Sequence, residues 1–394
     1  MDKKLFFVIG SITVVLLLAA AWGYLLFFGS PGMPGTFTNL DLVDGTEEVV
    51  LPIDTEPAEE PVVNLDERPA LRQLTTRPVA GFREVQTSTS SPRFLYYVEM
   101  GTGHLYRINL ATGQEERRSG TTLAMATEAA ISPNGDAVVL RSGQGTRAQV
   151  HVGRFSSSSP DALEFSLLPN NWLSYTFTAD GELLLAQQTD FSVIAQARDV
   201  VTNTSQTLFT VPFREAVIVW GAGADATHYV YPKPSRHLEG ALFAATTRGL
   251  ERLPIDGFGL TALASPQGIL FNRYEAGEYV SYTLGESESE PVLSPIILLP
   301  EKCVLETGSI AFCAGDFIDS TADLPDNWYM GLFQTSDAVW EISLNLGGAN
   351  QLVNPQQLVG RSINITDMTV STLTSELHFI NKTDNTLWLY EIPN

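Results

Sequence analysis

The chain has 394 residues, of which 44% are hydrophobic, and its 23 Lys and Arg against 45 Asp and Glu give a formal net charge of −22 at pH 7. This excess of negative charge repels phosphate backbones, so no nucleic acid partner is expected. After residue 30, Val, Ile, Thr, Tyr and Phe cluster in short runs broken by Gly, Pro, Asn and Ser, which predicts an all-β protein.

The N-terminal segment has the pattern of a signal anchor. Residues 1–4 include Lys3 and Lys4, and the uncharged apolar run 5–28 follows them. A helix over this run is long enough to cross the roughly 30 Å apolar core of a bilayer. The positive-inside rule then predicts a single-pass protein of the cell membrane, with a cytoplasmic tip at 1–4 and the rest of the chain outside. The alternative is a cleaved signal peptide with its small-residue site at 19–21.

Residues 29–68 form an acidic, proline-rich stretch in which Lys and Arg are absent until Arg68. Low hydrophobicity combined with like charge does not offset the entropy cost of folding. We therefore expect a disordered acidic linker that holds the following domain away from the membrane.

Short turn sequences recur through the rest of the chain at steps of about 40–46 residues, except for the last step. They are Ser91-Pro92, Ser132 to Gly135, Thr178 to Gly181, Gly223 to Asp225, Ser265 to Gly268, Thr307-Gly308 and Thr374-Ser375. This period is typical of propeller blades, each a four-stranded sheet that packs against its neighbours. The sequence predicts a seven-bladed β-propeller over residues 69–394.

The seventh repeat lacks a fourth strand of its own. Leu387 to Ile392 has the pattern of its third strand, and two residues follow. The segment 70–75 resembles the polar outer strands of other repeats. We expect it to supply the outer strand of blade seven and thereby close the ring.

The sixth repeat is longer than the others, at about 67 residues, and most of the excess falls between residues 314 and 330. Cys303 and Cys313 flank its Thr307-Gly308 turn at equal distances from Gly308. Paired strands would bring them opposite each other, so a disulfide and two buried free thiols are both open.

Two further groups of residues are candidates for binding. Asp316, Asp319, Asp323 and Asp326 offer oxygen ligands of the type that calcium prefers, although their spacing fits no standard calcium loop; turn and capping roles are the alternative. No other cofactor is expected. The aromatic candidates for an exposed binding face are Trp172, Trp220, Trp328 and Tyr329, with packing between blades as the alternative.

Parts of the sequence resemble known propellers. The Ser-Pro-Asn-Gly turn ending at Gly135, the Ser-Pro-Gln-Gly turn ending at Gly268 and the Leu-Tyr-Arg-Ile strand ending at Ile108 are similar to TolB/WD40-like β-propellers. The segments 302–303, 312–314, 324–329, 336–337 and 379–382 resemble a group of uncharacterised membrane-anchored bacterial propeller proteins. The resemblance implies an anchor, an acidic linker and a propeller, and it supplies no catalytic residue.

We find no motif that assigns catalysis: the five histidines are scattered, and no nucleophile elbow or phosphate-binding loop occurs. The expected function is therefore a non-enzymatic, extracytoplasmic module that binds a protein or a cell-wall glycan. An envelope hydrolase or lyase with its site in the central channel, and a structural subunit of an envelope complex, are the alternatives. Carboxylates or histidines at the channel mouth would favour the enzyme, whereas apolar and aromatic loops would favour binding.

Overall fold

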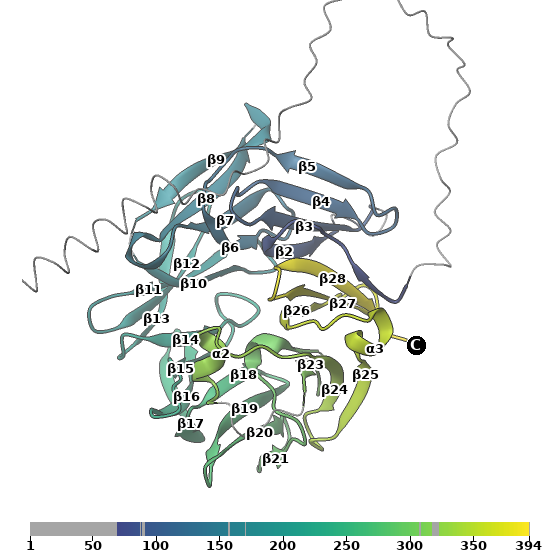
Figure 1. Ribbon diagram of the computed structural model, residues 1–394. Coiled ribbons are helices and arrows are strands. Elements are labelled where there is room, and N and C mark those ends of the chain that lie inside the picture. The colour runs from purple at the N-terminus through teal and green to yellow at the C-terminus, as the bar shows by residue number, and fades with distance from the viewer. Residues whose placement is uncertain are drawn as a thin grey trace, which may run out of the picture. The chain divides into compact units, whose positions relative to one another are not determined.

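The computed structural model describes residues 69–86, 88, 91–156, 158–169, 171–306, 309–316 and 323–393. Within these residues the chain forms seven four-stranded antiparallel sheets that surround a common centre (Figure 1). The predicted seven-bladed propeller is confirmed. The expected cytoplasmic tip (1–4), membrane helix (5–28) and linker (29–68) lie outside the described residues. In the part of the chain that is described, every helix is too short or too polar to cross a membrane.

Each of the first three blades is a consecutive four-stranded meander that starts at the channel and ends at the rim. Blade one contains β2 (Val79–Val85), β3 (Phe94–Glu99), β4 (Leu105–Asn109) and β5 (Glu115–Ser119). Blade two contains β6 (Ala126–Ile131), β7 (Ala137–Ser142), β8 (Gln149–Ser156) and β9 (Ser159–Leu168), with the 3-10 turn η2 (Gly145–Arg147) between β7 and β8. Blade three contains β10 (Trp172–Phe177), β11 (Leu183–Gln188), β12 (Val193–Arg198) and β13 (Ser205–Val211).

The remaining blades repeat this order, with additions in blades six and seven. Blade four contains β14 (Ala216–Val219), β15 (His228–Pro232), β16 (Glu239–Thr246) and β17 (Gly249–Phe258), and blade five contains β18 (Thr261–Ser265), β19 (Gly268–Glu275), β20 (Glu278–Gly285) and β21 (Val292–Leu293). Blade six contains β22 (Cys303–Leu305), β23 (Ile310–Gly315), β24 (Ala338–Ser343) and β25 (Ala349–Val353), with η3 (Pro300–Lys302) before it and α2 (Asp326–Tyr329) within it. Blade seven contains β26 (Ile365–Val370), β27 (Glu376–Asn381), β28 (Thr386–Glu391) and β1 (Leu71–Gln73), and α3 (Pro355–Val359) precedes β26.

The second strand of a blade carries most of its apolar residues because neighbouring blades cover both of its faces. In β11 the run Leu183 to Ala186 is fully buried, and β7 is buried from Ala137 to Leu140. The outermost strands are polar instead, as in β5, where Glu115 to Arg117 are exposed. The turn between the first and second strands of blade two requires a glycine. Gly135 has φ 72°, and a Cβ atom at this position would lie only 2.8 Å from the Tyr96 ring.

The strand β1 completes blade seven, as the sequence predicted. It pairs antiparallel with β28, with Leu71 opposite Tyr390 and Gln73 opposite Trp388. The backbone pairing extends past the strand, because Leu74 N donates to Leu387 O at 2.7 Å. Leu71 is buried in the core of the blade. A segment from the start of the domain therefore joins the last blade to the first and closes the ring.

Candidate functional site

The long loop between β23 and β24, residues 316–337, is called the blade-six insertion here. Its described part bonds to residues of three other blades at one end of the propeller. Arg236 N donates to Asp326 Oδ2 at 2.6 Å, Tyr274 Oη donates to Leu324 O at 2.7 Å, and Lys382 Nζ donates to Trp328 O at 3.4 Å. Figure 1 shows α2 of the insertion beside β14. The insertion therefore extends from blade six toward blades four, five and seven.

Trp328 anchors the insertion to the core of the propeller. Its side chain is only 1% exposed and packs with Tyr279, Leu299 and Leu324. Two ammonium groups lie over its ring: Lys302 Nζ at 4.3 Å and Lys382 Nζ at 3.5 Å from the ring centroid. The prediction that Trp328 is exposed on a binding face is wrong, because these cation–π contacts and the apolar cluster hold it in the core.

Lys302 is buried at the base of the insertion. Its Nζ donates to Thr335 Oγ1 at 2.7 Å, to Asn364 Oδ1 at 3.1 Å and to the carboxylate of Asp337. The same Asp337 oxygen accepts the backbone N–H of Ile365, in the innermost strand of blade seven, at 2.7 Å. Burial lowers the pKa of Lys302. The arrangement ties η3 and the C-terminal end of the insertion to blade seven, which is a structural role.

Tyr329 has the exposure that the sequence predicted, at 41%. Its hydroxyl points back into the protein and donates to Glu301 Oε1 at 2.6 Å. Burial raises the pKa of Glu301, and the buried Oε2 of this residue has no hydrogen-bond partner among the described residues. Tyr329 is thus partly exposed to solvent, while its hydroxyl donates a hydrogen bond to one of the two oxygens of the Glu301 carboxyl group.

The other two tryptophans have different environments. Trp172 is 3% exposed and belongs to the core between blades two and three, so its predicted place on a binding face is wrong. Trp220 is partly buried, and its Nε1 donates to Ser174 Oγ on β10 at 2.9 Å. Both tryptophans therefore pack between blades, as the alternative interpretation held.

Three of the four candidate calcium ligands, Asp316, Asp323 and Asp326, lie in the described residues, and they do not form a metal-binding group there. Asp323 pairs with the Arg236 side chain and Asp326 bonds the Arg236 backbone, so both hold the insertion to blade four. Asp316 is exposed, and Asp319 lies outside the described residues. Across the described part of the chain, no group of three or more His, Cys, Asp or Glu is arranged to hold a metal ion.

Cys303 and Cys313 are directly opposite each other in the β22–β23 pair. Their sulfur atoms form a disulfide bond, and their Cα atoms are 4.1 Å apart. The bond links the first two strands of blade six just before the insertion begins.

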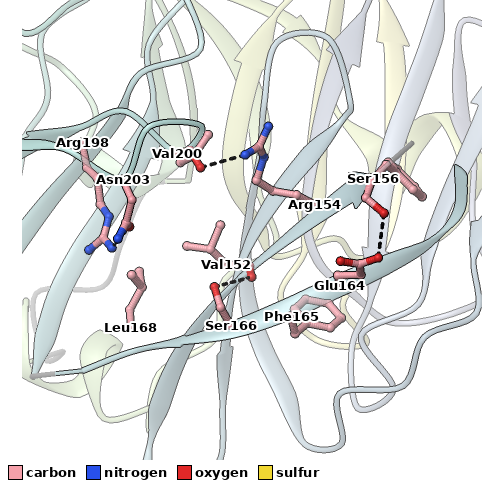
Figure 2. Close-up of a pocket in the computed structure, with 11 residues that line it drawn as sticks. Val152, Arg154, Ser156, Glu164, Phe165, Ser166, Leu168, Arg198, Val200 and Asn203 are labelled. Carbon is pink, nitrogen blue, oxygen red and sulfur yellow. Dashed lines mark hydrogen bonds between the residues drawn. The ribbon is translucent and has the colours of Figure 1, made fainter. Parts of the chain in front are cut away.

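A cavity of about 670 Å³ lies at the rim between blades two and three. Its polar groups already have partners within it: Arg154 Nη1 donates to Val200 O at 2.9 Å, and Ser156 Oγ donates to Glu164 Oε1 at 2.6 Å (Figure 2). A junction whose hydrogen bonds are satisfied internally leaves little for a ligand to bond. This cavity is therefore a weaker candidate than the two described next.

An apolar pocket of about 500 Å³ lies between the insertion and the inner strands of blades three and four. Its lining residues are Leu173, Gln188, Glu215, Ala216, Val217, Lys233, Pro234, Asp326, Tyr329 and Met330. Met330 is 62% exposed, and Leu332, two residues farther along the insertion, is 73% exposed. Large apolar side chains held at a surface pocket are typical of protein-binding sites.

A second cavity, of about 660 Å³, is the channel cavity, lined by the inner strands of blades seven, one, two and three. It shares Leu173 with the apolar pocket, so the two adjoin. Its polar lining residues are Thr127, Glu128, Ser174, Tyr175, Thr366, Asp367, Thr369, Lys382 and Asn385. The inner strands approach closely here: a Cβ on Gly81 would lie 2.1 Å from Ala129 O.

Asp367 is the unusual residue of the channel cavity. The β26–β27 register shifts between Thr366 and Thr369, and within this bulge Asp367 has φ 52°. Aspartate adopts this left-handed region more often than most residues with a side chain, and bulges commonly redirect side chains near functional sites. The Asp367 side chain is exposed at its surface, while the protein packed around it and the charges of Glu301 and Glu128 raise its pKa to about 6.

The sequence analysis missed Asp367, Lys382 and Glu128. A weak signal was present for Asp367, because aspartate is disfavoured in strands and this one lies inside the strand sequence Ile-Thr-Asp-Met-Thr-Val. The residues that line the channel cavity come from four blades that are far apart in the sequence, so the cavity could be recognised only from the folded structure.

Comparison with protein-family models gave no match, and comparison with curated proteins also gave none. Solved structures are similar in fold. The β-propeller domain of the Trilobed protease from Pyrococcus furiosus has 12% identity and a TM-score of 0.50, over 80% of this chain and 95% of that one. The β-propeller domain of Cps50 (Swd1) from Myceliophteria thermophila has 10% identity and a TM-score of 0.52, over 82% and 100%. At this identity the likeness shows the propeller fold alone.

The protease domain is described as having an open velcro topology, whereas β1 closes the ring in this chain. The resemblance to membrane-anchored bacterial propellers stays a prediction.

Proposed function

We propose that this propeller is a non-enzymatic binding module that recognises a protein partner through the end that carries the blade-six insertion. The observation that carries the proposal is the apolar pocket between α2 and the inner strands of blades three and four. Met330 and Leu332 expose apolar surface beside it, and Tyr329 forms part of its wall. An apolar centre with a polar surround is the usual arrangement of a protein-binding hot spot.

The channel cavity gives less support to a hydrolase or lyase. Acid–base catalysis usually places two titratable groups within reach of one reacting atom. Lys382 Nζ instead lies against the Trp328 ring and carbonyl, and no histidine is among the described residues that line the cavity. The cavity does hold two carboxylates, the feature that would favour the enzyme, but Glu128 is paired with Arg141 at 2.9 Å. The single unpaired carboxylate, Asp367, is better suited to binding than to a reaction sequence.

The binding proposal predicts that charge in the pocket rim blocks the partner. Met330→Asp and Leu332→Asp should each weaken capture of partner proteins by the full chain about thirtyfold, the effect of losing a hot-spot contact. Chemical crosslinking in cells followed by quantitative mass spectrometry measures the change. Leu373→Asp is the matched control, because Leu373 is 51% exposed in the β26–β27 turn, at the other end of the blades. Partners captured equally by all three variants would contradict the proposal.

We further propose that residues 5–28 anchor the chain in the cytoplasmic membrane, with the propeller outside. The apolar run, the preceding Lys3 and Lys4, and a disulfide suited to an oxidising compartment support this placement.

The anchor proposal predicts that the full-length chain stays in membranes washed with alkaline carbonate. A C-terminal tag should be degraded when protease is added to intact cells from which the outer layers have been removed. Immunoblotting follows both results. Release of a soluble species that lacks the first 21 residues would instead show a cleaved signal peptide.

A further inference from the structure

Asp367 presents an exposed carboxylate to the channel cavity. Among the described residues it has neither a hydrogen bond nor an ion pair, while the neighbouring charged groups are already engaged. Glu128 pairs with Arg141 at 2.9 Å, Glu301 accepts the Tyr329 hydroxyl, and Lys382 is held on Trp328. Asp367 is therefore the one carboxylate among the described residues lining this cavity that has no partner in the protein.

The backbone conformation indicates that Asp367 is positioned for a purpose other than packing. Asp367 has the left-handed backbone conformation within a bulge of an inner strand, a position that few residues with a side chain adopt. Glycine would occupy this conformation more readily, and aspartate and asparagine tolerate it better than most residues. The bulge thus places an unpaired carboxylate, with an unusual backbone conformation, in the channel cavity. An unusual conformation of this kind is a reason to look for a function.

We propose that Asp367 binds the ammonium group of a lysine side chain that the protein partner inserts into the channel cavity, while an adjacent apolar residue of the partner enters the apolar pocket. The two cavities share Leu173, so neighbouring residues of one segment can reach both. This inference rests on the proposed binding function and names the chemistry of the partner.

Lysine suits the site better than arginine. An ammonium group is a compact charge with three donors, and the cavity offers one free carboxylate with separate hydroxyl and amide oxygens on several strands. Thr366 and Asn385 contribute such oxygens, while the hydroxyl groups of Thr127 and Ser174 already bond to Arg141 O and Trp220 Nε1. A guanidinium group would need a second coplanar acceptor to use its fork.

The same geometry makes binding depend on pH. The charged groups that act on Asp367 are Glu301 next to β22, Glu128 on β6 and Lys382 in the β27–β28 loop. Since the pKa of Asp367 is about 6, about one tenth of the carboxyl groups are ionised at pH 5, whereas nearly all are ionised at pH 7.5. Affinity for a cation should therefore fall as the pH falls through 6.

The test uses the full chain in detergent and two small probes that differ only in charge. N-acetyl-lysine methylamide should bind, and N-acetyl-norleucine methylamide should bind at least about tenfold more weakly, as for a charge-assisted hydrogen bond. Isothermal titration calorimetry or ligand-observed NMR measures both. Binding of the lysine probe should weaken about tenfold between pH 7.5 and pH 5, and binding of the norleucine probe should not change.

Asp367→Asn should abolish the preference for the lysine probe and its pH dependence. Asp161→Asn, at an exposed carboxylate on the rim strand β9, is the matched control and should leave both intact. Asp367→Gly gives a second variant, because glycine relieves the backbone conformation and keeps the fold. Equal binding of the two probes to the unmodified chain, or an unchanged preference in either Asp367 variant, would overturn the inference.

Failure of this inference is distinguishable from failure of the proposed function. If Met330→Asp prevents partner capture while Asp367→Asn does not, the binding face stands and the lysine contact is refuted. If neither variant affects capture, the proposed function itself is refuted.

Discussion

Lys302→Met is expected to lower the free energy of unfolding by about 3–5 kcal/mol, because it leaves the carboxylate of Asp337 buried without its counterion. Lys302 is 2% exposed, and Asp337 is buried with it between the insertion and blade seven. Methionine keeps the length of the side chain, so the lost charge and hydrogen bonds account for the effect. Urea unfolding followed by tryptophan fluorescence measures it.

Two further variants separate the buried charge from other causes. Lys233→Met removes a lysine whose ion pair with Glu215 is exposed, and it should change stability by less than about 1 kcal/mol. Lys302→Met combined with Asp337→Leu should recover more than half of the loss, since the unpaired charge is gone and only the Ile365 N–H loses its acceptor. A Lys302→Met variant as stable as Lys233→Met would show that the pair does not hold the insertion.

A shortened chain that begins at residue 78 is expected to lose cooperative unfolding, whereas one that begins at residue 60 should keep it. The shorter chain lacks β1, so the outer edge of β28 loses its antiparallel partner and the buried Leu71 is removed from the core. An open ring exposes apolar surface and an unpaired strand edge. Differential scanning calorimetry distinguishes one sharp transition from a broad one.

Leu71→Ala in the full chain provides a graded control for closure. It should destabilise the protein by about 2–5 kcal/mol, the cost of a cavity at a buried leucine, while leaving unfolding cooperative. Equal thermal stability of the two shortened chains would mean that β1 does not close the ring in solution.

The fold was predictable because its signals are local. Strands β2, from Val79 to Val85, and β5, from Glu115 to Ser119, are each determined within one repeat by apolar runs and turn residues. The closing strand was also predictable, from a polar segment that matched the missing fourth strand.

The site was predictable only in part because it depends on distant contacts. The length of the sixth repeat indicated where an insertion would lie, and the exposure of Tyr329 followed from it. The burial of Trp328 depends on Lys302 and Lys382, which come from other parts of the chain. Asp367 became a candidate only when the ring brought β26 beside β2 and β10 around one cavity.

The pairing of β1 with β28 also sets the order in which the protein is completed during synthesis. Arg72 on β1 and Glu391 at the end of β28 form an ion pair across a sequence separation of 319 residues. Contacts of such separation form late, because a long loop must close before they contribute. Strand β1 is therefore synthesised before the other strands of the propeller but cannot pair until β28 has been synthesised. Blade seven, which carries Asp367, is the final sheet to assemble.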